Sequence, residues 1–243
     1  MERRTYALEL AYLGTGFSGY ARQPGRRTVE ATLREALGRQ GLGEVPLAVA
    51  GRTDAGVHAR RQVVSFRVRS ALDVEALRSA LAREPDLRLL RAGRVDDAFH
   101  ARASAKTRRY VYRLRIGGPP SPFRCVLPEG AYAWAAARAV LQAQLGTHER
   151  SPFTHRPGAP KQTTVTCASL EHIGSQRLIA RFEADGYTRH LIRNWLSAAL
   201  AAARGQAAPA SGARGFYGSP APAAGLCLWE VDYANDPWVG SRT

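Results

Sequence analysis

Residues 46–68 read PLAVAGRTDAGVHARRQVVSFRV, and this stretch decides the first half of the predicted fold. Pro46–Ala50 is a short apolar run, and Gln62–Val68 has a repeat of two residues. Such runs are typical of β-strands, whereas the glycines that bound Gly51–Gly56 favour a tight loop. We therefore expect two consecutive strands joined by a glycine-bounded loop.

Further strands and helices are expected on both sides of this pair. Apolar side chains recur at helical spacing in Thr28–Gln40, and Asp73 is a favourable N-cap for a helix over Asp73–Glu84. The outer strands are expected at Tyr6–Leu13 and Leu87–Val95. The resulting order, β-α-β-β-α-β, is that of the split βαβ or ferredoxin-like unit.

The second half of the chain repeats this order more loosely. Its expected elements are strands at Arg109–Ile116, Thr163–Leu170, Leu178–Ala184 and Leu226–Tyr233 and helices at Trp134–Leu145 and Thr188–Arg204. We therefore predict an α+β fold of two ferredoxin-like (βαββαβ) halves with antiparallel sheets. The predicted domains are 1–105, which carries the Asp54 loop, and 106–243.

Three segments are expected to be loops because of their composition. Gly117–Gly130 is rich in Pro and Gly, and Gly205–Gly225 is rich in Ala, Gly, Ser and Pro. Gly146–Gln162 is polar and contains three prolines, so we expect it to form a flap that faces the substrate.

The chain is strongly basic. It has 243 residues and a formal net charge of +15, and all but two of its 35 Lys and Arg residues are Arg. Arginine suits bidentate contacts with phosphate and stacking on bases. A basic chain of this kind therefore points first to a polyanion, most often nucleic acid, and the alternative is a solvated basic surface.

The cysteines indicate a reduced environment. Cys125, Cys167 and Cys227 are widely spaced and form no CxxC pair, which argues against a disulfide framework and against a zinc site. The N-terminal residues lack the apolar core of a signal peptide, and no apolar run is long enough to span a membrane. We therefore expect a cytoplasmic protein.

Asp54 is the first candidate for chemistry. It lies between two glycines, and Arg52 precedes it by two positions. A carboxylate beside arginine stays ionised, which suits a nucleophile and does not suit a general acid. The alternative is an ordinary turn, because Asp side chains commonly hydrogen-bond their own backbone in loops.

A second candidate segment is DDAFHAR at 96–102, followed by RRYVY at 108–112. Aromatic side chains interleaved with arginines are what stacking on bases and contact with phosphates require. The alternative is a hydrogen-bonded loop histidine followed by two core tyrosines. A metal site formed by Asp54, Asp96 and Asp97 is disfavoured, because the surroundings are basic and no further acidic residues cluster nearby.

A third candidate segment is DGYTRHLIRN at 185–194. It lies at the start of the expected helix Thr188–Arg204, in which Arg189 and Arg193 would share one face. Arginines near a helix N-terminus oppose the helix dipole, which favours a phosphate or carboxylate partner. A solvated basic face is the other interpretation.

Three of these motifs resemble the tRNA pseudouridine synthase A family, in chain order. GRTDAGVHA at 51–59 is similar to its active-site motif, FHARASAKTRRYVYRLRI at 99–116 to its second motif, and GYTRHLIRN at 186–194 to its third. Weaker similarities are YLGTGFSGYARQ at 12–23, SPF at 121–123 and APAAGLCLWEVDY at 221–233. The chain departs from the family pattern at Leu13, Tyr20, Ala21 and Glu149-Arg150.

The resemblance implies two ferredoxin-like halves around a central RNA-binding cleft, which agrees with the order of elements. It also implies isomerisation of uridine to pseudouridine at positions 38, 39 and 40 in the anticodon stem-loop of tRNA, on a base flipped out of its stack. The implied partners are tRNA and a second copy of the chain, with no metal or organic cofactor, no membrane and no DNA.

The resemblance further implies roles for particular residues. Asp54 is the nucleophile and attacks either the uracil ring or the ribose C1′ atom. Arg193 pairs with Asp54 and orients it, and Tyr110 stacks on the target base and removes the C5 proton. Arg52 fills the space that the flipped base leaves. The other RNA-binding residues are His58, His100, Arg102, Tyr112, Arg189 and Arg22.

Three alternatives stay open. The chain would be an RNA-binding module without catalysis if its two halves were tandem RNA-recognition domains, but we find no strand with the aromatic-rich motif of those domains. A metal-dependent nuclease would use Asp54, Asp96 and Asp97. A synthase with another RNA target is the third.

Overall fold

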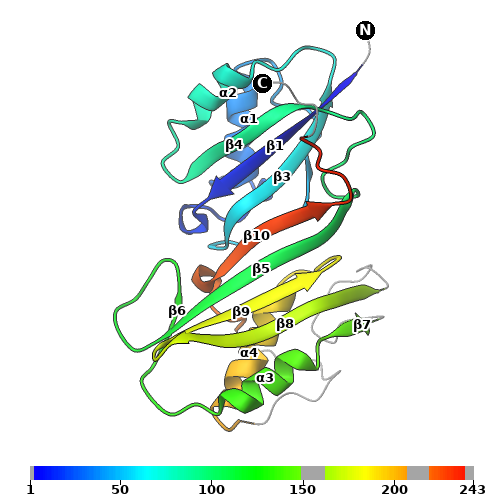
Figure 1. Cartoon of the computed structure of the whole chain (residues 1–243). Helices are drawn as coiled ribbons and strands as arrows, with labels where there is room; N and C mark the ends of the chain where they lie inside the picture. Colours follow the sequence, from blue (N-terminus) through cyan, green and yellow to red (C-terminus); the bar gives the residue numbers. More distant parts are fainter. Residues whose placement is uncertain (1–2, 149–161, 207–218, 239–243) are drawn as a thin grey trace. The chain divides into compact units, whose positions relative to one another are not determined.

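The computed structural model describes residues 3–148, 162–206 and 219–238. It comprises two compact units: unit 1 is Met1–Arg108 with Leu228–Thr243, and unit 2 is Arg109–Cys227. Both units contain strands and helices (Figure 1), which confirms the predicted α+β class. The finer description as two ferredoxin-like halves around a cleft stays a prediction.

The C-terminal part of the chain belongs to unit 1, which differs from the predicted division into domains 1–105 and 106–243. We expected 106–243 to form one domain, whereas the residues after Cys227 belong to unit 1. β10 (Leu226–Tyr233) lies beside β3 (His58–Val68) in the sheet, and Thr107 Oγ1 donates to Asp232 Oδ2 over 2.6 Å. This pairing joins strands that are far apart in the sequence, so no local pattern reveals it.

The sheet of unit 1 is centred on β1 (Arg4–Tyr12). β1 pairs antiparallel with β3 and with β4 (Leu87–Val95), and β2 (Ala48–Val49) pairs antiparallel with β3. In this register Leu8 of β1 lies opposite Val64 of β3, and both side chains are fully buried. The register therefore places apolar side chains of neighbouring strands on the same buried face.

Two helices lie on one face of this sheet (Figure 1), α1 (Val29–Gly38) and α2 (Val74–Leu81). α2 begins at its predicted N-cap, Asp73, and α1 begins one residue after its predicted start, with Thr28 as its N-cap. The Thr28 side chain accepts a hydrogen bond from the Ala31 N–H over 3.2 Å, and Asp73 accepts one from the Ala76 N–H over 2.9 Å. A cap of this kind contributes about 1 kcal/mol to helix stability.

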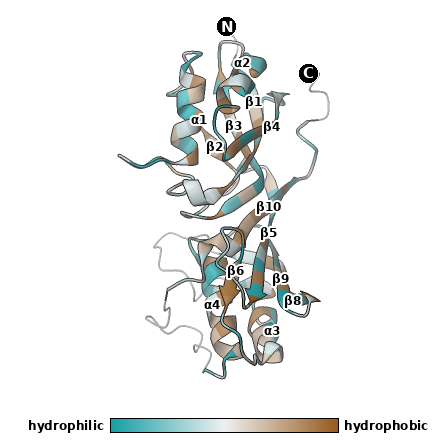
Figure 2. Cartoon of the chain, turned by 90° about the vertical axis from the view of Figure 1, so that its left-hand side faces the viewer, coloured by the Kyte–Doolittle hydropathy of each residue, from teal (hydrophilic) through white to brown (hydrophobic). Residues whose placement is uncertain are grey.

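Leucines from the sheet and from both helices form the core of unit 1. Those buried to below 2% exposure are Leu8, Leu10, Leu33, Leu37, Leu77, Leu81, Leu87 and Leu228. Figure 2 shows hydrophobic and hydrophilic residues mixed along α1, as expected for a helix with one buried face. Truncation of one such leucine to alanine costs about 2–5 kcal/mol of unfolding free energy.

The sheet of unit 2 has the strand order β5-β9-β8-β7, with β6 beside β5. Its strands are β5 (Ala105–Ile116), β6 (Cys125–Leu127), β7 (Gly146–His148), β8 (Thr163–Gly174) and β9 (Arg177–Ala184). β6 runs parallel to β5, so the prediction of purely antiparallel sheets was wrong here. Gly117 and Gly118 have φ of 67° and 86° and turn the chain after β5, where the Pro- and Gly-rich loop was expected.

Two helices pack on the strands of unit 2, α3 (Trp134–Gln142) and α4 (Leu191–Ala203). Trp195 of α4 packs against Phe182 of β9 with ring centroids 6.0 Å apart. On α3, Arg138 Nε donates to the Leu170 carbonyl of β8 over 3.0 Å. None of the helices among the described residues is long and apolar enough to cross a membrane.

Two of the segments expected to be loops contain short strands. β6 lies within Gly117–Gly130, and β7 forms the start of Gly146–Gln162. The rest of the expected flap, at 149–161, and most of Gly205–Gly225, at 207–218, lie outside the described residues.

Candidate active site

The loop between β2 and β3 carries Asp54, which is half-buried. The Val57 N–H donates to the Asp54 carbonyl over 3.1 Å and closes the loop on itself. The loop that follows β1 binds it from outside, because the Tyr20 N–H donates to the Thr53 carbonyl over 3.0 Å. The backbone on both sides of Asp54 is therefore fixed by hydrogen bonds.

Two glycines allow these loops to approach so closely. A Cβ atom at Gly14 would lie 2.0 Å from the Val57 carbonyl oxygen. A Cβ atom at Gly19 would lie 3.1 Å from the Thr53 carbonyl oxygen, and Gly19 has a φ of 94°, which residues with a Cβ atom rarely adopt. These glycines thus set the distance between the first loop and the Asp54 loop.

Gln62 of β3 binds the start of the Asp54 loop. Its side chain is fully buried, its Nε2 atom donates to the Gly51 carbonyl over 2.6 Å, and its Oε1 atom accepts from the Gly51 N–H over 3.4 Å. Tyr12 Oη and Thr53 Oγ1 share a hydrogen bond of 2.8 Å beside it. The sequence analysis missed this clamp, although an amide at an inward-facing position of a strand was a signal for it.

His58 begins β3 and is only 6% exposed. Its Nδ1 atom accepts a hydrogen bond from the Gly14 N–H over 3.0 Å, so Nδ1 carries no proton in this arrangement. This burial does not agree with the expectation that His58 faces RNA. The histidine instead connects the first loop to the strand that follows Asp54.

Arg108 connects the first two motifs within unit 1. Its side chain is almost buried, and it donates from Nε to the Ala50 carbonyl over 3.1 Å and from Nη2 to the Arg102 carbonyl over 2.7 Å. His100 Nδ1 accepts from the Arg102 N–H over 3.2 Å in the same segment. The structure therefore brings the start of the second motif against the residue that precedes the Asp54 loop.

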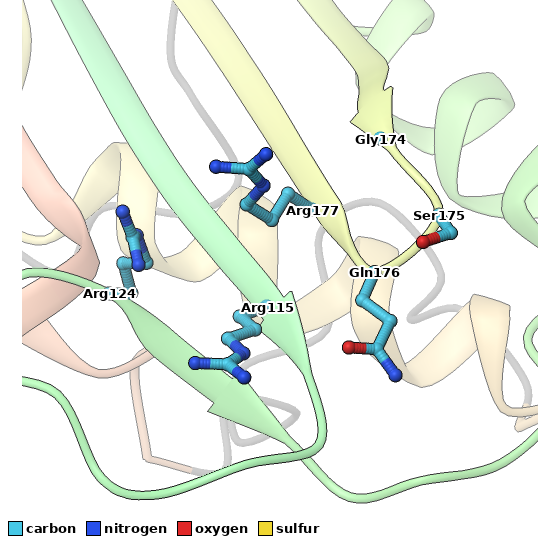
Figure 3. A pocket seen from close by; sticks show the side chains of 6 residues that line it. All are labelled: Arg115, Arg124, Gly174, Ser175, Gln176 and Arg177. Atoms are coloured by element: carbon cyan, nitrogen blue, oxygen red, sulfur yellow. The ribbon is translucent and has the colours of Figure 1, made fainter.

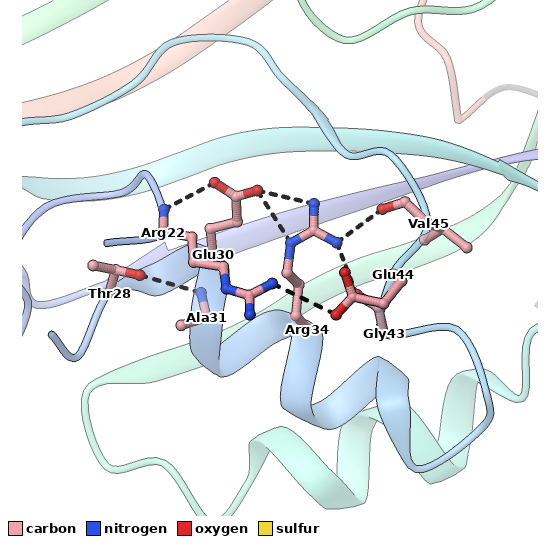
Figure 4. Close-up of polar contacts among 8 residues, drawn as sticks. All are labelled: Arg22, Thr28, Glu30, Ala31, Arg34, Gly43, Glu44 and Val45. Carbon is pink, nitrogen blue, oxygen red and sulfur yellow. Dashed lines mark hydrogen bonds and ion pairs between the residues drawn. The ribbon is translucent and has the colours of Figure 1, made fainter. Parts of the chain in front are cut away.

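Four of the predicted RNA-binding residues lie on the surface of unit 1: Arg22, Arg52, His100 and Arg102. The Arg22 N–H donates to Glu30 over 3.0 Å, and its guanidinium lies 3.5 Å from Glu44 (Figure 4). An ion pair this exposed is worth at most about 1 kcal/mol, so a phosphate can displace Glu44 from Arg22.

Tyr110 of β5 is 7% exposed and packs edge-on against Tyr187, with ring centroids 5.2 Å apart. Tyr187 in turn packs on Trp195 of α4. Burial raises the pKa of the Tyr187 hydroxyl, which therefore stays protonated. Within the part of the chain that the structure describes, Tyr187 Oη and Thr188 Oγ1 are buried without a hydrogen-bond partner. Such atoms are unusual in a folded protein, because buried polar groups are normally hydrogen-bonded.

Arg193 is half-buried on α4 and donates from Nε to the Ala221 carbonyl over 2.7 Å, while the Ala221 N–H donates to the Arg193 carbonyl over 3.1 Å. Arg189 is exposed and precedes the helix. The prediction that both arginines share a helix face was wrong. His190 has a φ of 62°, which no right-handed helix contains, so α4 begins only at Leu191.

Tyr112, another predicted RNA contact, lies in the core of unit 2 with no exposed surface. Its hydroxyl donates to the Pro222 carbonyl over 2.9 Å, and a Cβ atom at Gly225 would lie 2.6 Å from its ring. Burial, and the Cys125 thiol beside it, raise the pKa of the Tyr112 hydroxyl. The ring therefore supports the 222–225 segment from the core.

The carboxylates of Asp96 and Asp97 accept hydrogen bonds from backbone N–H groups of unit 1. Asp96 Oδ1 accepts from the Ala98 N–H over 2.7 Å, and Asp97 Oδ1 accepts from the Thr5 N–H over 2.9 Å, a bond that lowers the pKa of the Asp97 carboxyl. Among the described residues, no three His, Cys, Asp or Glu side chains are grouped so that they could hold a metal ion.

A carboxylate fixed in a glycine-bounded loop, with exposed arginines on the same α+β unit, fits the class of RNA-modifying enzymes. Comparison with known proteins narrows this class. The chain is 34% identical to "tRNA pseudouridine synthase A" of Solibacter usitatus, over 95% of this chain and 100% of that protein. It is also 34% identical to the protein of that name from Geobacillus kaustophilus, over 96% and 95% of the two chains.

A third protein of the same name, from Frankia casuarinae, is 34% identical over 97% of this chain and 91% of its own length. The chain belongs to the tRNA pseudouridine synthase A family, and its enzyme class is isomerase. No family model matches the chain. A chain in the crystal structure of a Cbf5-Nop10-Gar1 complex has a TM-score of 0.37 and 13% identity over 80% of this chain and 45% of its own length, a likeness that carries no argument.

Proposed function

We propose that this chain converts uridine to pseudouridine at positions 38, 39 and 40 in the anticodon stem-loop of tRNA, with Asp54 as the nucleophile. The observation that carries the proposal is the Asp54 loop, whose sequence matches the family motif and whose backbone is fixed on both sides by Tyr20 and Val57. A nucleophile held in this way loses little conformational entropy when it reaches the reacting atom.

The reaction requires one bond to break and one to form. The N1–C1′ glycosidic bond breaks, the uracil turns while it stays bound, and a C5–C1′ bond forms. The C5 proton leaves and N1 gains a proton, so no oxidant, reductant or co-substrate is consumed. Asp54 attacks either the uracil ring or C1′, and both routes need an ionised carboxylate and a base removed from its stack.

Tyr110 and Arg193 complete the proposed catalytic set. Tyr110 stacks on the target base and removes the C5 proton, and Arg193 keeps the Asp54 carboxylate ionised and oriented in the complex with tRNA. The Tyr187 ring packs against Tyr110, and among the described residues the buried Tyr187 Oη and Thr188 Oγ1 atoms have no hydrogen-bond partner, which supports a base-binding role for this part of unit 2. A uracil edge offers the donors and acceptors that such atoms need.

The exposed basic residues are proposed to bind the RNA backbone: Arg22, Arg52, His100, Arg102 and Arg189. Together with the net charge of +15, they predict that binding weakens steeply as salt increases, because counterions are released from the RNA. We further propose that the chain acts in the cytoplasm as a homodimer without a metal or organic cofactor, and that tRNA rather than DNA or a membrane is its partner.

Release of tritium from tRNA transcripts labelled at uracil C5, in the presence of EDTA, tests the proposal. Wild type and the control D96N should release tritium, because the Asp96 carboxylate accepts a local hydrogen bond from the Ala98 N–H and has no role in the proposed mechanism. D54A and D54N should release none and should bind tRNA within several-fold of wild type.

Transcripts in which U38, U39 or U40 is replaced by cytidine then test the location. If each replacement removes the tritium release that its uridine contributed, the result supports positions 38, 39 and 40. Unchanged release would place the reaction at another uridine. Tritium release by D54A would remove Asp54 as the nucleophile. If wild type released no tritium but bound tRNA tightly, the chain would be an RNA-binding protein that does not catalyse this reaction.

A further inference from the structure

A polar pocket of about 350 Å³ lies within unit 2, and no residue of the proposed mechanism is among those that line it (Figure 3). Its lining residues are Arg115, Arg124, Gly174, Ser175, Gln176 and Arg177. Half of them are arginines, and none has an apolar side chain beyond the arginine stems. We call it the arginine pocket. Sites for small organic molecules are usually lined by apolar and aromatic side chains, so this lining indicates an anionic ligand instead.

The topology of unit 2 brings these residues together from three segments. Arg115 lies near the end of β5, Arg124 directly precedes β6, and Arg177 begins β9 after the turn from β8. The parallel register places Leu114 opposite Cys125, and the Ile116 N–H donates to the Gln176 carbonyl over 2.8 Å. The pocket is therefore built by strand pairing and by a backbone hydrogen bond.

The three arginines of the pocket differ from nearby arginines in having no carboxylate partner among the described residues. Within the described residues, no carboxylate forms an ion pair with Arg115, Arg124 or Arg177. By contrast, Arg181 of the same strand β9 pairs with Glu171 over 2.5 Å. Guanidinium groups that share a pocket repel one another, and a bound anion removes that repulsion.

Arg115 is also positioned by the backbone beside it. A Cβ atom at Gly118 would lie 2.7 Å from Arg115 Cζ, and Gly118 has a φ of 86°. The backbone at Gly118 therefore lies directly beside the guanidinium, and its positive φ favours a glycine there. A guanidinium presents two parallel N–H donors, which match two oxygens of a phosphate group.

We propose that the arginine pocket binds backbone phosphate groups of tRNA as a docking site separate from the Asp54 loop. This inference rests on the proposed function, because it takes tRNA as the ligand. The pocket offers phosphate contacts and no surface on which a base could stack, so it contributes affinity and orientation but no sequence preference. Its loss should raise KM and leave the chemical step unchanged.

The variant R115Q/R124Q/R177Q tests this proposal. The matched control is R78Q/R94Q/R181Q, which removes the same charge from three arginines that each pair with a carboxylate and are 44%, 56% and 45% exposed. We expect the pocket variant to raise KM and Kd for tRNA about tenfold more than the control, with kcat at saturating tRNA within about twofold of wild type.

Salt dependence and a lysine variant sharpen the test. The slope of log Kd against log salt should become shallower by about two to three units in the pocket variant, roughly one for each lost phosphate contact. R115K/R124K/R177K keeps the positive charges but lacks the paired N–H donors of the guanidinium groups. Its KM for tRNA should therefore lie between that of wild type and that of the glutamine variant. Thermal melting verifies that each variant is folded.

Three results would overturn the proposal. The first is a pocket variant with the KM and salt slope of the matched control. The second is a loss of kcat with unchanged KM. The third uses inorganic phosphate as a probe. Phosphate would raise the melting temperature of wild type but not of the pocket variant, and the two proteins would have the same KM for tRNA. The pocket would then be a site for a small anion and not for tRNA. Wild type that forms no pseudouridine would contradict the proposed function, whereas the binding comparison would still decide the role of the pocket.

Discussion

The backbone N–H of Gly14 donates to His58 Nδ1 over 3.0 Å, and both residues are buried. This bond joins the loop after β1 to the first residue of β3, which directly follows the Asp54 loop. Because Gly14 also lies against the Val57 carbonyl, the histidine and the glycine together fix the end of that loop. The histidine of the GRTDAGVHA motif therefore supports the Asp54 loop through the backbone.

H58A should lower the free energy of unfolding by about 2–4 kcal/mol, because it leaves the buried Gly14 N–H without an acceptor and opens a cavity. H58N should recover part of this loss, since the Asn Oδ1 atom can accept the same bond. Urea denaturation measures both, and kcat/KM should follow the same order. A variant H58A with wild-type stability and a raised Kd for tRNA would instead support an RNA-facing histidine.

The ion pair between Arg27 and Asp86 predicts how stability depends on pH. Arg27 donates from Nη1 and Nη2 to the two Asp86 carboxylate oxygens, each over 2.7 Å, and these bonds lower the pKa of Asp86 from 3.8. A carboxyl whose pKa is lower in the folded state stabilises the protein above its unfolded pKa. That contribution is lost as the pH falls through the folded pKa.

D86N should therefore be less stable than wild type by about 1–2 kcal/mol at pH 7, and this difference should shrink as the pH falls below about 4. Urea denaturation at pH 7, 5 and 3 measures it. E75Q is the matched control, because Glu75 forms a more exposed pair with Arg78 at 3.5 Å. A D86N deficit that stayed constant from pH 7 to pH 3 would show that packing, not charge, causes it.

Arg193 is predicted to affect the rate far more than the fold. R193A removes the Nε bond to the Ala221 carbonyl, and S197A removes the bond from Ser197 Oγ to the Ser219 carbonyl at 3.2 Å, so both loosen the same segment from α4. R193A should lower kcat at least about 100-fold, as expected for a group that orients the nucleophile, while S197A stays within about threefold. Equal effects in pseudouridine formation would leave Arg193 with a structural role alone.

Helix caps and strand periodicity were readable from the sequence because they depend on neighbouring residues. Asp73 caps α2 as predicted, Thr28 lies at the start of α1 as predicted, and β4 and β10 have the predicted bounds. The start of α4 was not predicted, because the left-handed conformation of His190 has no signature in its residue type. β6 was missed because three residues between glycine-rich segments give no periodic signal.

The sequence by itself determined the α+β class, the family and the Asp54 loop, since each follows from short-range patterns and from a motif of nine residues. Only the tertiary structure showed that Gln62, His58 and Arg108 hold the backbone of that loop. Only the tertiary structure places three arginines in one pocket of unit 2 where no described carboxylate pairs with them. These arrangements join residues that are distant in the chain, and the free energy that favours them comes from burial and hydrogen bonding, which no local pattern records.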